Sequence, residues 1–230
     1  MDKERNRLIR SFIFPIIFIL AIWLVKVIEV AFDIPFGPYG LRPLHWVGLP
    51  GILTMPLIHS GWNHLFANTI PLFILSAFLF YSYREIAWKV LIFIYLLSGL
   101  WVWFLGQFES VHIGASGVVY GLAAFLFTSG IIRRDTRLMA ITLIVAFLYG
   151  GLIWGVFPQF FPQEKISWEG HLMGLLAGTI LAIYFRKIGP QRPHFEWEDE
   201  ENDDDPYSGY HPDDPKAPKP PDVNYHYRDN

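Results

Sequence analysis

The chain has 230 residues, of which 53% are apolar, 17% are aromatic and only 17% are charged, against about 25% charged residues in average soluble domains. Twenty Phe and nine Trp are more than a soluble core of this size could bury, so the composition excludes an ordinary soluble domain. The chain has no Cys, which excludes a disulfide scaffold, thiol catalysis and Cys-ligated metals. It has no basic stripe typical of a nucleic-acid binder, and no cofactor motif is recognised.

Six apolar runs follow one another along the chain, each close to the roughly 20 residues that a helix needs to cross a bilayer. The predicted spans are residues 11–30, 65–82, 86–106, 115–132, 138–157 and 169–186. Residues 31–63 are rich in Gly and Pro, and they are predicted to form a long structured outer loop at the membrane surface. The expected fold class is all-α: a polytopic membrane domain over residues 11–189, preceded by a basic segment over residues 1–10.

Lys and Arg in the connections predict the orientation, because they accumulate on the cytoplasmic side. Twelve of them fall on one side of the predicted topology, in the N-terminal segment, in the second and fourth connections and after the sixth span. Only Lys26, Arg42 and Lys165 fall on the other. Both termini are therefore expected in the cytoplasm, and the second, fourth and sixth spans begin at the outer face.

Residues 190–230 differ from the rest of the chain. They contain twelve Asp and Glu against four Lys and Arg. Such a segment buries too little apolar area to offset its ordering entropy. We expect a disordered acidic cytoplasmic tail that acts as a solvated segment, with a docking motif in its Pro-rich part as the minority interpretation.

Polar side chains are costly near membrane spans and are candidates for function there. Three groups of them stand at the predicted outer ends of the second, fourth and sixth spans. They are His59, Asn63, His64 and Asn68; the Gly114-Ala115-Ser116-Gly117 run; and Glu169-Gly170-His171. Their common depth favours one shared site.

The residue types in these groups suit acyl-transfer chemistry. Ser116 offers a hydroxyl nucleophile and His171 a general base, while His64 and Asn68 share one helix face and can donate to an oxyanion. Small residues every fourth position would let the fourth and sixth spans approach closely; they are Gly117 and Gly121 on one span and Gly170, Gly174 and Gly178 on the other.

An acidic third member is not expected. Asp135 falls on the cytoplasmic side, and Glu169 is two residues from His171 and points to another helix face. The pattern indicates a Ser–His dyad. Each of these residues also has a purely structural interpretation: the Ser can bond to its own helix, the His can be interfacial, and the glycines can serve packing alone. Their joint occurrence at one depth is harder to explain in that way.

With these motifs the chain resembles the rhomboid intramembrane serine proteases of the minimal six-helix bacterial type, over about residues 40–186. The motifs are His64-Leu65-Phe66-Ala67-Asn68, Gly114-Ala115-Ser116-Gly117 with Tyr120, and Gly170-His171-Leu172-Met173-Gly174 with Gly178. The Trp-Arg pair found in the first loop of many members is not evident, and Arg42 is the nearest feature.

The resemblance implies that Ser116 is the nucleophile and His171 the base. The Ser116 N–H and the His64 and Asn68 side chains would form the oxyanion hole, and Tyr120 would stack on His171. It places His59 near the water-access region, makes loop 31–63 a partly embedded hairpin, and makes the fifth helix and loop 157–168 a gate and cap. It also implies a bacterial inner membrane location.

The function expected is an intramembrane serine endopeptidase that cleaves transmembrane helices of other membrane proteins near the outer face. The alternative is a catalytically inactive rhomboid-like protein that binds membrane clients, and a small transporter or channel ranks last because no span shows a midplane charge. The partners expected are transmembrane substrates and the lipid bilayer, without nucleic acid. The sequence leaves open the physiological substrate, the cleavage sequence, the oligomeric state and the roles of the tail, His59 and Arg42.

Overall fold

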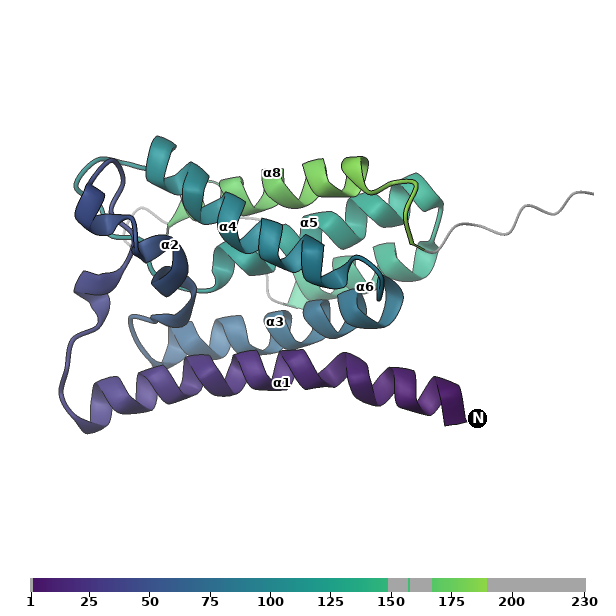
Figure 1. Cartoon of the computed structure of the whole chain (residues 1–230), viewed down its shortest axis with the longest axis horizontal. Coiled ribbons are helices and arrows are strands. Elements are labelled where there is room, and N and C mark those ends of the chain that lie inside the picture. Colours follow the sequence, from purple (N-terminus) through teal and green to yellow (C-terminus); the bar gives the residue numbers. More distant parts are fainter. Residues whose placement is uncertain (1, 149–156, 158–166, 190–230) are drawn as a thin grey trace, which may run out of the picture. The chain divides into compact units, whose positions relative to one another are not determined.

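The computed structural model of the chain describes residues 2–148, 157 and 167–189, and most of these residues are in helices (Figure 1). The long helices are α1 (Asp2–Ala31), α3 (Trp62–Ser82), α4 (Ala87–Leu105), α5 (Ser116–Arg133), α6 (Thr136–Leu148) and α8 (Trp168–Tyr184). Four short elements lie between α1 and α3: the 3₁₀ helices η1 (Gly37–Tyr39), η2 (Trp46–Gly48) and η3 (Met55–Leu57), and helix α2 (Gly51–Thr54).

Four of the described helices are long and apolar enough to cross a membrane, namely α1, α3, α4 and α5. Helix α8 coincides with the sixth predicted span and has 17 residues. Helix α6 begins two residues before the fifth predicted span and covers its first half, and most of that span's remainder lies outside the described residues. The cap expected in loop 157–168 and the tail over residues 190–230 also lie outside the described residues, except for residues 157, 167 and 168.

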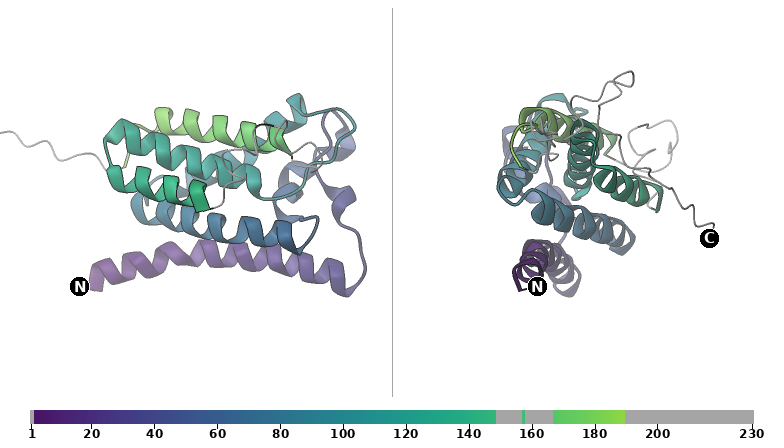
Figure 2. Two further views of the ribbon diagram at one scale, coloured as in Figure 1. Left: turned by 180° about the vertical axis from the view of Figure 1, so that it is seen from behind. Right: turned by 90° about the vertical axis from the view of Figure 1, so that its right-hand side faces the viewer.

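Helix α5 is the central helix and contacts α3, α4, α6 and α8, whereas α1 packs mainly on α3 (Figures 1 and 2). In the most apolar window of each helix, 61% of the α5 residues are buried but only 28% of those in α1. The outward face of α1 carries exposed Ile and Leu side chains, which is the surface that a helix presents to lipid. The helix that carries Ser116 is thus the one most enclosed by protein.

The loop between α1 and α3 is held by specific contacts, as a structured loop requires. The Lys26 ammonium, in α1, donates to the Glu29 carboxylate at 2.7 Å and to the His59 carbonyl at 3.2 Å. The backbones of Leu41 and His112 exchange two hydrogen bonds and so join this loop to the α4–α5 loop. A Cβ on Gly51 would overlap the Leu41 backbone, so α2 can lie this close only with glycine there.

The end of α5 opposite Ser116 is fixed by Arg133. Its Nη2 donates to the carbonyls of Phe185 at 2.9 Å and Ile188 at 2.7 Å, just beyond the last turn of α8. The Phe185 carbonyl also accepts the Ile188 N–H at 2.9 Å, and a cation suits the negative end of the helix dipole. Arg133 therefore joins the ends of α5 and α8.

Candidate active site

Ser116 is the first residue of α5, and the backbone before it is shaped by Gly114. Gly114 has φ +111°, which L side chains rarely adopt, and its N–H donates to the Met55 carbonyl at 2.8 Å. A Cβ on Gly114 would lie 2.7 Å from the His64 ring, so the glycine also lets that ring approach. Its conformation and the close contact together explain why glycine stands two residues before the serine.

His171 lies in the first turn of α8, and its side chain meets Ser116. Its Nε2 is 2.8 Å from Ser116 Oγ, and the residue is only 8% exposed. The Tyr120 ring, one turn beyond Ser116 on α5, stacks on the imidazole with centroids 4.2 Å apart and planes 8° from parallel. The imidazole is therefore held in one plane with a nitrogen directed at the hydroxyl.

The glycines predicted to line α5 and α8 lie where the two backbones approach most closely. A Cβ on Gly174 would overlap the Gly117 carbonyl oxygen, and one on Gly178 would overlap the Gly121 carbonyl oxygen. No side chain larger than hydrogen fits at these two positions without moving a backbone. The distance between Ser116 and His171 is therefore set by the packing of glycine against backbone.

His64 and Asn68 lie one turn apart on α3, as their spacing predicts. The His64 ring faces Gly114, and its Nδ1 is 3.1 Å from Ser60 Oγ. The Asn68 side chain is 4% exposed and donates one amide hydrogen to the His64 carbonyl at 2.8 Å. That bond fixes the amide plane and leaves its second hydrogen for another acceptor.

His59 lies behind His64, with ring centroids 5.0 Å apart in an edge-to-face arrangement. The pKa of His59 is lowered from 6.5 to about 3, chiefly by burial and also by the neighbouring His64 and Lys26, while the Leu57 backbone acts in the opposite direction. His59 is therefore neutral at physiological pH.

His112 was not singled out from the sequence, yet it connects the two segments that carry Ser116 and His171. Its Nδ1 is 2.6 Å from Oγ of Ser167, the residue that caps α8, and its Nε2 is 2.7 Å from Ser110 Oγ. Burial lowers the pKa of His112, while Glu169 acts in the opposite direction. The signal that could have indicated it is its position, two residues before Gly114 in the short loop between α4 and α5.

The carboxylates considered as third members lie elsewhere. Asp135 accepts the backbone N–H of Arg137 at 3.0 Å, at the start of α6. Glu169 is buried on the side of α8 that faces His112. Among residues 2–148, 157 and 167–189, no three His, Asp or Glu side chains cluster closely enough to hold a metal ion.

The fold and the site define a class, an all-helical membrane protein with a Ser and a His in contact at one end of two closely packed helices. Comparison with known proteins agrees. The chain matches the rhomboid domain over residues 48–188, more than half of its length, and it therefore belongs to the rhomboid family and is an integral membrane protein.

Two mycobacterial relatives and one from Bacillus illustrate this relationship. The chain is 37% identical to the uncharacterized protein Rv1337 of Mycobacterium tuberculosis over 171 residues, which are 72% of this chain and 71% of that protein. It is 32% identical over 190 residues to the uncharacterized protein ML1171 of Mycobacterium leprae, covering 79% and 75% of the two chains. YdcA of Bacillus subtilis, a relative named for the rhomboid proteases, is 28% identical over 142 residues, covering 57% and 65%.

Proposed function

We propose that the chain is an intramembrane serine endopeptidase that cleaves transmembrane helices of other membrane proteins near the outer face, with Ser116 as nucleophile and His171 as base. One observation carries the proposal: the 2.8 Å contact between Ser116 Oγ and His171 Nε2. A Ser buried in a helix for packing usually bonds a carbonyl of its own helix, whereas this one faces an imidazole on another helix.

In the first half of the reaction, Ser116 Oγ attacks the carbonyl carbon of the scissile peptide bond while its proton passes to His171 Nε2. This transfer requires the neutral tautomer with its proton on Nδ1. Stacking on Tyr120 keeps the ring in the plane that the transfer needs. His171 then gives the proton to the leaving amine, and the C–N bond breaks to leave an ester on Ser116.

The tetrahedral intermediate carries a negative charge that needs donors in place. The N–H of Ser116 lies in the first turn of α5. The first hydrogen bond of that helix is donated by the Val118 N–H to the Ala115 carbonyl, so the Ser116 N–H is not used by the helix itself. If the Ser60 hydroxyl donates to His64 Nδ1, the His64 proton is on Nε2, the atom that faces the Gly114 backbone. His64 and Asn68 would thus complete the oxyanion hole as neutral donors.

In the second half, water loses a proton to His171 and attacks the ester carbon. The second tetrahedral intermediate expels the Ser116 oxygen, which takes the proton back from His171. The products are a free carboxyl group on one fragment and a free amine on the other. A substrate helix satisfies its own backbone hydrogen bonds, so it must unwind locally before attack, which favours substrates with Gly, Pro or polar residues near the cut.

The distribution of basic residues supports an orientation for this reaction. Arg133, Arg134, Arg186 and Lys187 stand at the ends of α5 and α8 opposite the Ser116 site. Positive charge accumulates at the cytoplasmic face, so the site would lie at the outer side of a bacterial inner membrane with both termini in the cytoplasm.

The test reconstitutes the purified chain in proteoliposomes with single-span substrates, and it compares wild type with Ser116→Ala and His171→Ala. Loss of a nucleophile or its base costs about 10³–10⁶ in rate. Ser129→Ala is the matched control, because Ser129 lies on the same helix, roughly 20 Å from Ser116 at about 1.5 Å per residue. Wild type and the control should cleave and should be labelled by a fluorophosphonate, and neither site variant should. Cleavage above a tenth of the wild-type rate in Ser116→Ala would reject the proposal and favour a client-binding protein.

A further inference from the structure

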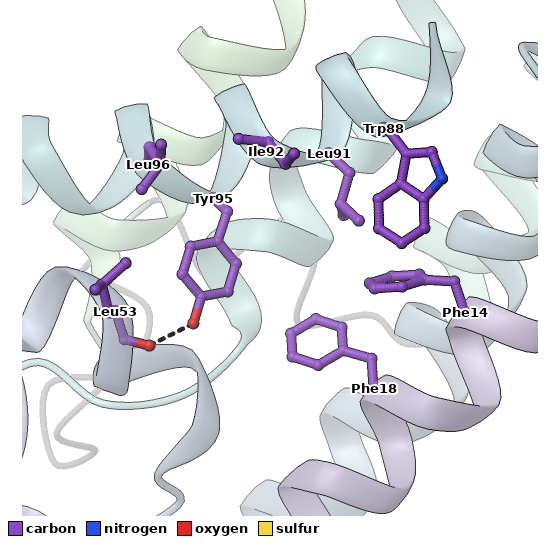
Figure 3. A pocket seen from close by; sticks show the side chains of 8 residues that line it. All are labelled: Phe14, Phe18, Leu53, Trp88, Leu91, Ile92, Tyr95 and Leu96. Atoms are coloured by element: carbon purple, nitrogen blue, oxygen red, sulfur yellow. Dashed lines mark hydrogen bonds between the residues drawn. The ribbon is translucent and has the colours of Figure 1, made fainter. Parts of the chain in front are cut away.

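A cleft between α1 and α4, which begins at the end of the molecule opposite Ser116, combines a basic pocket with an apolar trough. The pocket has a volume of about 310 Å³ and is lined by Arg7, Arg10, Ser11, Phe80, Arg84 and Trp88. The trough has a volume of about 320 Å³ and is lined by Phe14, Phe18, Leu53, Trp88, Leu91, Ile92, Tyr95 and Leu96 (Figure 3). Trp88 lines both, so the two cavities adjoin at this side chain.

The basic pocket holds positive charge that the described chain does not neutralise. Arg10 and Arg84 are exposed, and neither forms a hydrogen bond or an ion pair with another described residue. Arg7 is fixed in place, because its Nε and Nη2 donate to the Tyr81 carbonyl at 3.0 and 2.7 Å and its guanidinium lies over the Tyr81 ring. The nearby acid Glu4 accepts the Tyr81 hydroxyl at 3.2 Å.

The trough is apolar along its length, and Tyr95 and Leu53 line its far end. Phe14, Phe80 and Trp88 form a cluster of rings with centroids 4.9–5.1 Å apart at its mouth. Figure 3 shows Phe14 and Phe18 of α1 facing the α4 side chains, and the Tyr95 hydroxyl donating to the Leu53 carbonyl where the trough ends. A cavity of this volume admits an alkyl chain but not a second helix, whose diameter is about 10 Å.

The depths of these groups match one leaflet of a bilayer. Arg84 lies in the turn between α3 and α4, and Trp88 follows in the first turn of α4, so Arg84 is at the water end of that helix. Trp side chains prefer the headgroup level. From Trp88 to Leu96 the trough extends about 12 Å along α4, against about 15 Å of hydrocarbon in one leaflet.

We propose that this cleft binds one anionic phospholipid, with the headgroup phosphate at Arg10 and Arg84 and one acyl chain in the trough between α1 and α4. Clusters of basic residues beside membrane helices attract anionic lipid. A zwitterionic lipid would bring its ammonium group next to three guanidinium groups, so the charge favours an anionic headgroup. The basic end makes this a lipid of the leaflet on the Arg-rich side.

The test titrates the purified full chain in detergent with phosphatidylglycerol and with phosphatidylcholine, and counts bound lipid by native mass spectrometry. Wild type should hold one phosphatidylglycerol in clear preference to phosphatidylcholine. Arg10→Gln with Arg84→Gln should weaken that binding about 30-fold, because each basic group near the surface contributes roughly fivefold in affinity. Lys3→Gln with Lys89→Gln removes the same charge at the same end of the molecule without touching the cleft, and it should bind as wild type does.

A second variant examines the trough. Ile92→Trp places a large ring in the acyl-chain path at an exposed position, so it should weaken phosphatidylglycerol binding while the melting temperature without lipid stays at the wild-type value. The proposal is overturned if the Lys variant loses as much binding as the Arg variant, or if the two lipids bind equally. It is also overturned if Ile92→Trp binds normally, or if soluble glycerol 3-phosphate displaces the lipid completely, since the site would then recognise an anion alone.

Discussion

Gly174→Ala adds one methyl group at the contact between α8 and α5, and it provides a sharp test of how the reacting pair is positioned. The new Cβ would overlap the Gly117 carbonyl oxygen and lie 2.9 Å from the Gly117 carbonyl carbon. Non-bonded carbons prefer about 3.5–4.0 Å, so the two backbones must separate by roughly 1 Å. The same shift at His171, three residues earlier, would lengthen its 2.8 Å contact with Ser116 beyond hydrogen-bond range.

A displacement of about 1 Å costs about 10²-fold in rate, and overpacking costs about 1–3 kcal/mol of stability. Cleavage in proteoliposomes and thermal unfolding in detergent measure the two effects. Gly117→Ala is the milder comparison. Its Cβ would lie 3.1 Å from the Gly170 carbonyl oxygen, so the two backbones need to separate by only a few tenths of an ångström. Gly37→Ala is the control, since nothing lies within 4 Å of its added Cβ. If Gly174→Ala cleaves and melts as Gly37→Ala does, the glycine contact does not set the Ser–His distance.

Three further results are expected. Tyr120→Leu should lower turnover more than Tyr120→Phe, because Phe keeps the ring that stacks on His171; equal rates for Leu and Phe would dismiss the stacking role. His64→Ala and Asn68→Ala should each lose up to about 10²–10³ in rate, with the double variant clearly slower than either, and unchanged turnover in a correctly folded double variant would reject the oxyanion role. Because the pKa of His59 is lowered to about 3 in the folded protein, the unfolded chain binds the extra proton between pH 6.5 and about 3. Stability should therefore fall with decreasing pH in that window by up to about 1.4 kcal/mol per pH unit; His59→Phe should show a flatter profile in detergent unfolding, and a parallel profile would show that His59 does not titrate in this way.

Hydrophobicity alone predicted where most of the helices lie, and it placed the starts of α4, α5 and α8 to within one residue, but it missed the starts of α1 and α3. The first span was placed at residue 11, where the apolar run starts, whereas α1 begins at Asp2. The hydropathy of a run marks the part that crosses lipid, and the polar residues before it are themselves good helix formers. Likewise α3 begins at Trp62 rather than residue 65, because the Leu65 N–H already bonds the Gly61 carbonyl.

The candidate site could be predicted in part, because its polar residues stand at the starts of three predicted spans. Ser116 and His171 were expected to meet, and they are in hydrogen-bond contact. Loop 31–63 could be predicted only as structured, because its short helices depend on contacts such as Gly51 against Leu41 that are far apart in the sequence. His112 was not predicted for the same reason, since its partners Leu41 and Ser167 are brought to it only by the fold.

Arg133 has a consequence for how the molecule opens. Helices α5 and α8 are joined by Ser116 and His171 at one end, by Arg133 and the carbonyls of Phe185 and Ile188 at the other, and by backbone contacts at glycines between. Local openings in proteins follow cooperative units of this kind. We therefore expect the two helices to exchange their amide hydrogens and to unfold as one unit, so that a displacement of α1 or α6 would not separate Ser116 from His171.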